Sequence, residues 1–297
     1  MRLDLGAREE LVAEVEEIRQ RYQVVGRREE LRRILAAARA GKHILLEGPV
    51  GVGKTFLAKV VASHLGREFI RVDGDERLTE TRLIGYWDPP MVLSRGYVRE
   101  AFVEGPLTRA ALSGGVLFIN ELNRLPESAQ NALLPVMDEG IIVVPHLGEF
   151  RAREGFLIVA TQNPEESIGV TRLSEALRDR FVLVRLEYQS EEEEREIVRL
   201  RSGVEDPRIV STAVRIVRET RSDPSIRRGA SVRSAIDLAS VVRQISEDPT
   251  EGDWVTAAIM VLSPRVELRD GVTDDVESVI RDLVLRVLRE ASEDFRE

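Results

Sequence analysis

The clearest chemistry in this sequence lies in an eight-residue loop at positions 48–55. The loop reads Gly-Pro-Val-Gly-Val-Gly-Lys-Thr, follows an apolar run at 43–46 and precedes a helix-like segment. This is the G-x-x-x-x-G-K-[ST] pattern in the strand, loop and helix context that it requires, so it predicts a site for a nucleoside triphosphate. Glycines let backbone N–H groups turn toward phosphates, and the positive end of the following helix dipole points at them. The predicted nucleotide-binding residues are Pro49, Val50, Gly51, Val52, Gly53, Lys54, Thr55 and Phe56.

Two side chains at the end of this loop have separate roles. Lys54 is predicted to reach the β- and γ-phosphates, and the hydroxyl of Thr55 to hold Mg²⁺. Only three of the 43 basic residues are lysines, at positions 42, 54 and 59. Lys54 therefore stands out in a chain whose cations are almost all arginine.

A second site element is a buried strand predicted at 116–119, which ends in Asn120 and Glu121. It looks like a Walker B strand. A carboxylate at its tip can polarise the attacking water beside a phosphate chain neutralised by a metal ion. We interpret Glu121 as the catalytic carboxylate, with a solvent-facing glutamate at a strand end as the alternative.

Three further candidates follow in the sequence. Asn163 ends another apolar run, where its amide could bridge the γ-phosphate and the lytic water, although Asn-Pro is also a common turn opener. Arg180 precedes the run at 181–186, where an arginine could stabilise transition-state charge at a neighbouring subunit's nucleotide. Arg233 begins a helix of the second predicted domain. Most arginines are surface residues, so composition alone does not favour a functional role for Arg180, Arg233 or the nearby Arg178.

The elements that must position these residues form a predicted α/β fold. Five apolar runs alternate with helical patterns, which predicts a parallel sheet with helices on both faces. Ligands of such sheets bind at the carboxyl ends of the strands, where the phosphate loop falls. The five runs are 43–46, 69–72, 116–119, 156–160 and 182–186.

The rest of the chain is predicted to be helical. Helices are expected at 8–22 and 29–40, with a short extended segment at 24–27 between them. Beyond about Tyr188 the strand signals stop, which divides the chain into an α/β domain at 1–188 and an all-helical domain at 189–297. The helices of the second domain are expected at 190–201, 207–221, 231–245, 253–265 and 274–291.

Composition narrows the class of protein. A hydrophobic content of 43% supports a sizeable core, and no apolar run approaches the ~20 residues that span a bilayer. The acidic, amphipathic N-terminus does not resemble a signal peptide. With no cysteine, disulfides and thiolate metal sites are excluded, which fits a reducing cytoplasm. We expect a soluble cytoplasmic protein without membrane insertion.

These segments together resemble the MoxR group of AAA+ ATPases over nearly the whole chain. The blocks at 120–124, followed by 130–134, and at 160–164 are more specific than the phosphate loop, and 173–181 and 229–233 also match. The resemblance implies an AAA+ P-loop NTPase core, with a parallel five-stranded sheet and helices on both faces, followed by an all-helical lid domain.

The resemblance also assigns roles. Asn163 becomes sensor 1, Arg180 the arginine finger acting on the next subunit, with Arg178 left as the alternative, and Arg233 sensor 2. Val25 and Gly26 fall where such proteins contact adenine, which favours ATP. The family forms rings, usually hexamers, with ATP sites between subunits, and the segments at 86–97 and 141–152 match its central-pore insertions. Its clients are proteins, often one with a von Willebrand A domain or a metalloenzyme.

Asn120 departs from the family pattern, which has an acid at this position. The expected Asp orients water in the coordination shell of magnesium, whereas an amide accepts a hydrogen bond but brings no negative charge. We keep Asn120 as an outer magnesium contact beside the direct ligand Thr55, and expect slower or more magnesium-dependent hydrolysis.

Three functions compete at this point. The leading hypothesis is an ATP-driven remodelling chaperone for another protein, and the second is a nucleotide-dependent assembly switch, which Asn120 keeps open. The third is a nucleic-acid motor. The net charge of −9 and an insertion whose basic residues are chiefly Arg95 and Arg99 argue against nucleic acid as a partner.

Overall fold

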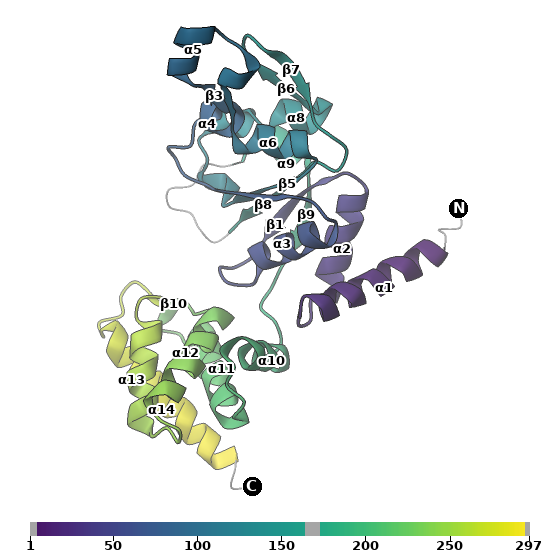
Figure 1. Cartoon of the computed structure of the whole chain (residues 1–297). Helices are drawn as coiled ribbons and strands as arrows, with labels where there is room; N and C mark the ends of the chain where they lie inside the picture. The colour runs from purple at the N-terminus through teal and green to yellow at the C-terminus, as the bar shows by residue number, and fades with distance from the viewer. Residues whose placement is uncertain (1–4, 164–172, 295–297) are drawn as a thin grey trace. The chain divides into compact units, whose positions relative to one another are not determined.

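The computed structural model describes residues 5–163 and 173–294, which fold into two compact units. The first comprises residues up to 49 and 53–187, and the second comprises 188 onward, with which the loop residues 50–52 are grouped. The first unit combines a sheet with helices, and the second is mainly helical (Figure 1).

The first unit is built on a five-stranded parallel sheet with the strand order β2-β5-β8-β1-β9. All five predicted apolar runs are strands of this sheet, so the predicted α/β fold is confirmed. Most strands read as continuous apolar runs because both faces of the sheet are covered. The strands are β1 (His43–Glu47), β2 (Phe69–Asp73), β5 (Val116–Asn120), β8 (Leu157–Gln162) and β9 (Phe181–Arg185).

Helices cover both faces of the sheet, as Figure 1 shows. The helices α2 (Arg28–Arg39) and α3 (Lys54–His64) pack with β1 and its neighbours, and α6 (Pro106–Ser113) packs with β2 and β5. Alternate strand residues such as Leu117 and Ile119 join α6 in one fully buried apolar cluster. The remaining helical segments of this unit are α1 (Leu5–Arg21), α4 (Glu80–Ile84), η2 (Leu122–Arg124), α7 (Glu127–Asn131), α8 (Leu134–Glu139) and α9 (Glu175–Arg178).

His43 fixes the start of β1 against β8. Its ring nitrogen Nδ1 accepts a hydrogen bond from the backbone N–H of Ile158 at 2.9 Å. Burial lowers the pKa of His43 to about 4, so the ring stays neutral and keeps this acceptor at physiological pH. The contact helps to align the two central strands whose carboxyl ends carry the phosphate loop and Asn163.

The prediction of an extended segment at 24–27 is wrong. Gly26 and Arg27 have φ angles of 62° and 58°, so the chain turns there in the left-handed region. The side chain of Arg27 explains the turn, because its guanidinium is buried and donates to the carbonyl of Glu187 at 2.8 Å while pairing with Glu30. These tertiary contacts override the extended preference of the preceding valines.

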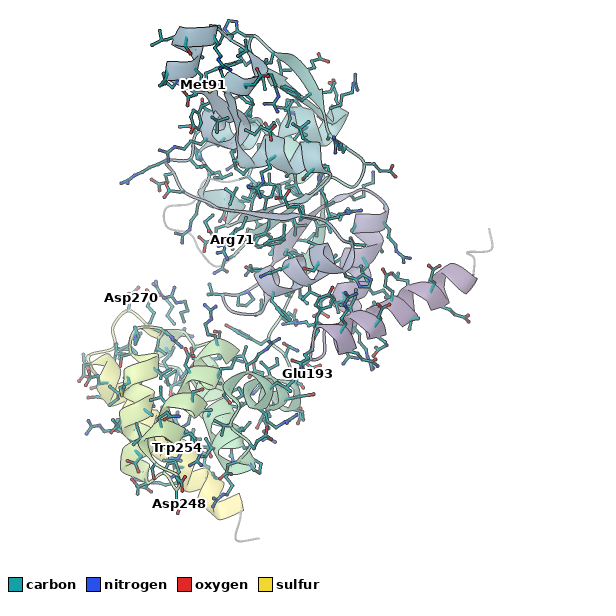
Figure 2. All side chains as sticks on the ribbon, viewed as in Figure 1. Arg71, Met91, Glu193, Asp248, Trp254 and Asp270 are labelled. Carbon is teal, nitrogen blue, oxygen red and sulfur yellow. The ribbon has the colours of Figure 1, made fainter. Side chains whose placement is uncertain are left out.

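Two insertions project from the first unit. One contains β3 (Gly85–Trp87), α5 (Pro89–Arg95), η1 (Arg99–Ala101) and β4 (Phe102–Glu104), and Figure 2 labels Met91 on α5. The other is the expected hairpin, formed by β6 (Ile141–Val144) and β7 (Gly148–Arg151). Tyr97 of the first insertion stacks on His146 of the hairpin with ring centroids 4.0 Å apart, so the two insertions are held together.

The second unit is mainly helical, as predicted. Its helices enclose one apolar core that includes Trp254 and Val284. Ser190 and Glu193 form a capping box at the start of the first helix. A short pairing of β10 (Ile226–Arg228) with β11 (Glu267–Leu268) was not anticipated. The helices are α10 (Glu191–Ser202), α11 (Pro207–Ser222), α12 (Val232–Ile245), α13 (Glu251–Leu262) and α14 (Val276–Asp294).

None of the helices in the described ranges 5–163 and 173–294 is both long and apolar enough to cross a membrane.

Candidate functional site

The phosphate loop leads directly from β1 into α3. Gly51 and Gly53 adopt left-handed φ angles of 80° and 95°, which a residue with a Cβ rarely adopts. Helix α3 begins at Lys54, and no side chain caps its N-terminus. This combination of left-handed glycines and an uncapped helix start is suited to binding an anion through backbone N–H groups.

Lys54 lies against the loop that it terminates. Its ammonium group donates hydrogen bonds to the carbonyls of Gly48 and Pro49, the latter at 2.8 Å. Thr55 follows it in the first turn of α3 and is partly exposed, and the next residue, Phe56, is exposed. The predicted phosphate-binding and magnesium-binding side chains therefore start from one rigid helix turn.

The carboxyl ends of β5 and β8 are joined by the side chain of Thr161. This fully buried hydroxyl donates to the Oδ1 atom of Asn120 at 3.1 Å and accepts from the backbone N–H of Glu121 at 2.9 Å. Asn163, two residues later, is also buried. The structure thus brings together Asn120 at the end of β5, Glu121 directly after it, and the end of β8 that leads to the predicted sensor. Thr161 was not among the predicted site residues, although it lies in the Ala-Thr-Gln-Asn-Pro block at 160–164.

Glu121 has an unusual backbone conformation. Its φ and ψ are both 57°, which for a non-glycine residue costs of order 1–3 kcal/mol and is found preferentially at functional sites. Its carboxylate lies 2.9 Å from the guanidinium of Arg124. Gly74 makes this turn possible, because a Cβ at position 74 would lie 2.1 Å from the carbonyl oxygen of Glu121. The strain and its support fix the direction in which Glu121 leaves the sheet.

A carboxylate that sequence analysis did not single out lies next to Asn120. Asp73 ends β2, directly opposite Asn120 in the register, and its Oδ1 accepts from the amide of Asn120 at 3.0 Å. The hydrogen bond from Arg71 is the main cause that lowers the pKa of Asp73, with a smaller contribution from Asn120. Arg71 is labelled in Figure 2. The negatively charged carboxylate of Asp73 therefore lies beside the neutral amide of Asn120.

The two arginines near the start of β9 differ in their surroundings. Arg180 forms a two-pronged ion pair with Asp138, with both nitrogen–oxygen distances at 2.6 Å, and also donates to the carbonyl of Ala176. That hydrogen bond lowers the pKa of Asp138. Arg178 is exposed and makes no side-chain ion pair within the described residues. Contacts within this chain therefore hold Arg180 in a defined position, whereas Arg178 is exposed to solvent.

Arg233 lies in the second unit, in the first turn of α12, where it is exposed. The segment before it is held by Arg221, which donates through Nε to the carbonyl of Ala230 at 2.8 Å. Arg221 also lies over the ring of Tyr188 at 4.0 Å and pairs with Glu194 at 2.7 Å. Arg221 thus connects the beginning of this unit with the segment that precedes Arg233.

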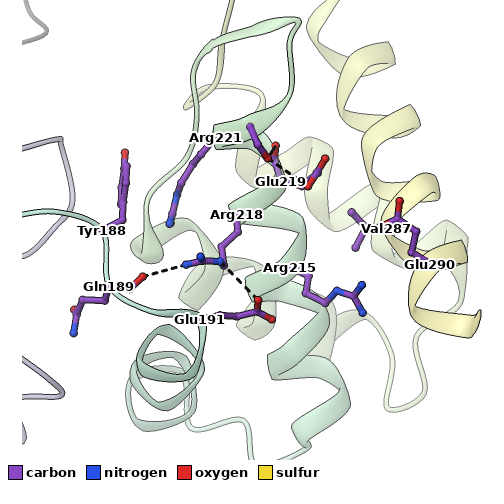
Figure 3. Close-up of a pocket in the computed structure, with 10 residues that line it drawn as sticks. Tyr188, Gln189, Glu191, Arg215, Arg218, Glu219, Arg221, Val287 and Glu290 are labelled. Carbon is purple, nitrogen blue, oxygen red and sulfur yellow. Dashed lines mark hydrogen bonds and ion pairs between the residues drawn. The ribbon is translucent and has the colours of Figure 1, made fainter. Parts of the chain in front are cut away.

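The same region of the second unit contains a pocket of about 460 Å³, shown in Figure 3. Arg218 crosses it, donating to the carbonyl of Gln189 at 3.1 Å and to Glu194 at 3.3 Å. The side chain of Glu194 is only 2% exposed and pairs with both Arg218 and Arg221, two of the residues that line the pocket.

Comparison with known proteins decides the family. Residues 43–181 match the AAA domain (dynein-related subfamily). The gas vesicle ATPase GvpN of Haloferax mediterranei is 31% identical over 81% of this chain and 74% of its own length. Chaperone MoxR1 of Mycobacterium tuberculosis is 36% identical over 62% of this chain and 46% of its own length.

The chain belongs to the MoxR-type AAA+ ATPases. A MoxR-type protein is a nucleotide-binding protein of an ATPase family, so the phosphate loop and the end of β5 have the expected context. Solved structures agree on the fold. A Cytophaga hutchinsonii protein named provisionally as an ATPase aligns over 96% of this chain and 98% of its own, with a TM-score of 0.52 and 23% identity. A point mutant of Thermotoga maritima RuvB aligns over 80% of this chain and 71% of its own, with a TM-score of 0.52 and 21% identity.

Proposed function

We propose that this MoxR-type chain hydrolyses ATP within a homo-oligomeric ring, of hexameric size, and uses that energy to remodel or mature a partner protein. The observation that carries the proposal is the end of β5, where Glu121 is held in a strained conformation by Thr161. A fixed carboxylate at the same sheet edge as a phosphate loop is suited to activating water for phosphoryl transfer. Family membership supports the general activity.

The phosphate loop supports the binding step. Left-handed glycines and the uncapped start of α3 offer backbone N–H groups to the phosphates, and Lys54 adds a positive charge to the β- and γ-phosphates. The hydroxyl of Thr55 and, through water, the Oδ1 of Asn120 are the groups that would hold Mg²⁺, which neutralises phosphate charge when bound. We place adenine beside Val25 and Gly26, where the chain makes its left-handed turn.

The hydrolysis step uses residues at the sheet edge. Glu121 accepts a proton from the attacking water while the water oxygen bonds to the γ-phosphorus, and the bond to the bridging oxygen of ADP breaks. Asn163 orients that water as sensor 1. Arg180 from a neighbouring subunit and Arg233 stabilise the negative charge of the transition state.

Arg180→Ala is expected to lower ATP turnover by at least ~10³-fold while leaving ATP binding unchanged, because an arginine finger acts mainly in the transition state. Arg178→Ala is the matched control, since it removes a nearby exposed charge. Steady-state phosphate release and the binding of a fluorescent ATP analogue measure the two effects. A large loss with Arg178→Ala instead would move the finger role to Arg178. Equal loss of binding and turnover in Arg180→Ala would show that the Asp138 pair is only structural.

A protein client is supported by the first insertion. Leu93 on α5 is 89% exposed, and Tyr86 and Tyr97 are each about half exposed. Exposed apolar and aromatic side chains on a projecting element are suited to contacting another polypeptide. We propose a cytoplasmic protein client, with a von Willebrand A domain protein as the first one to test.

Two alternatives remain distinct from this proposal. An assembly switch would form the ring on binding ATP without measurable turnover, and the neutral Asn120 is the observation that favours it. A nucleic-acid motor would show turnover stimulated by single-stranded DNA or RNA, and the net charge of −9 argues against it.

A further inference from the structure

The end of strand β2 contains an acidic residue that has no part in the mechanism above. Asp73 is the register partner of Asn120, and the two side chains are joined by a hydrogen bond of 3.0 Å from Nδ2 to Oδ1. Arg71 pairs with the same carboxylate at 2.6 Å. Asp73 is therefore an ionised acceptor fixed from two sides.

This hydrogen bond determines which way the amide of Asn120 faces. Strand β5 lies between β2 and β8, and β8 lies between β5 and the phosphate-loop strand β1. The donor end of the amide points to Asp73 on β2, and the acceptor end points to Thr161 on β8. The oxygen of Asn120 thus lies on the side of β5 that is nearer to the phosphate loop.

Without an acceptor on β2, the two orientations of the amide would be more nearly equal in energy. A flipped amide would direct its NH₂ group, a hydrogen-bond donor, toward β8. The water molecules around a bound cation also donate, so they require an acceptor at this position. An aspartate in place of Asn120 would not need such control, because both of its oxygens are acceptors. The carboxylate of that aspartate would also lie at hydrogen-bond distance from the carboxylate of Asp73, where the two negative charges repel each other.

We propose that Asp73 is a positioning residue for magnesium binding, which orients the amide of Asn120 so that this asparagine can do the work of the usual Walker B acid. The inference rests on the proposed ATP site and adds a residue on β2, a strand from which the sequence predicted no site residue. Asp73 and Asn120 act as a pair, in which β2 carries the negative charge and β5 carries the acceptor oxygen.

The test is a double-mutant cycle read by nucleotide binding and not by turnover. The Mg²⁺ concentration for half-maximal binding of a fluorescent ATP analogue is measured for the full chain and for Asp73→Ala, Asn120→Asp and the double variant. We expect Asp73→Ala to raise this concentration roughly three- to tenfold when Asn120 is present, the effect of losing one hydrogen bond of ordinary net strength, because the Asp73 carboxylate is exposed to solvent. The rise should vanish when Asp73→Ala is made in the Asn120→Asp background.

Matched variants separate this effect from charge and folding. Asp75→Ala removes one exposed negative charge two residues beyond Asp73 without touching Asn120, and should leave the Mg²⁺ requirement unchanged. Asp73→Asn keeps an acceptor and should fall between the native chain and Asp73→Ala. Thermal unfolding without nucleotide checks that each variant is folded.

Two results would overturn the inference in different ways. If Asp73→Ala leaves the Mg²⁺ requirement unchanged, or raises it equally in the native and the Asn120→Asp backgrounds, Asp73 is not a positioning residue although the ATP site stands. If the native chain binds no nucleotide at any Mg²⁺ concentration, the proposed function fails first and this inference with it.

Discussion

Glu121→Gln is expected to lower ATP turnover by roughly 10²- to 10⁴-fold, the usual contribution of a positioned general base. Glutamine has nearly the same size and keeps a hydrogen-bond acceptor, but its amide cannot take a proton from water. The turn at position 121 is held through the backbone N–H by Thr161, so the loop should keep its shape. Binding of ATP should therefore change by no more than a few-fold. Steady-state phosphate release and analogue binding, measured on the same preparation, test both statements.

The control is Glu127→Gln, which removes an exposed carboxylate from the first turn of α7 nearby. Its turnover should match that of the native chain. Turnover of Glu121→Gln within several-fold of the native rate would mean that another group activates water. A native chain that assembles on ATP without turnover would instead favour the assembly switch.

Lys54→Ala is expected to weaken ATP binding by roughly 10- to 100-fold, because charged hydrogen bonds contribute about 1.5–3 kcal/mol. The ammonium group is already held at the loop by the carbonyls of Gly48 and Pro49, so little ordering is needed when phosphates bind. Titration of a fluorescent ATP analogue, with Mg²⁺ in excess, measures the loss.

Lys59→Ala provides a close control, since Lys59 is exposed on the same helix α3 and is one of only three lysines in the chain. It should bind ATP as the native chain does. Equal weakening by both substitutions would attribute the effect to general charge and would remove the specific role of Lys54. Thermal unfolding of both variants shows whether the loop contacts of Lys54 also stabilise the fold.

The core of this fold could be predicted from sequence because its signals are local. Most strands of the sheet are apolar runs, and the serine and acidic first turn at 190–194 mark the start of α10. The phosphate loop is likewise a contiguous pattern. Periodicity and short motifs carry this information without any knowledge of tertiary contacts.

The parts that could not be predicted depend on residues far apart in the chain. Asp73 and Asn120 are 47 positions apart, and only the pairing of β2 with β5 places them together. The turn at Arg27 depends on the carbonyl of Glu187, 160 positions away. Asn120 could be recognised as a departure from the family, but the carboxylate beside it could not, because register is a property of the folded sheet.

The central claim is that the ATP site is shared between neighbouring subunits, with Glu121 from one and Arg180 from the next. Mixing Glu121→Gln with Arg180→Ala tests it most directly, because each variant should be nearly inactive alone. In a randomly mixed ring, about one interface in four would combine an intact Glu121 with an intact Arg180, so turnover should recover to roughly a quarter of the native rate. Turnover that stays at the level of the separate variants, in rings shown to contain both, would contradict a shared site.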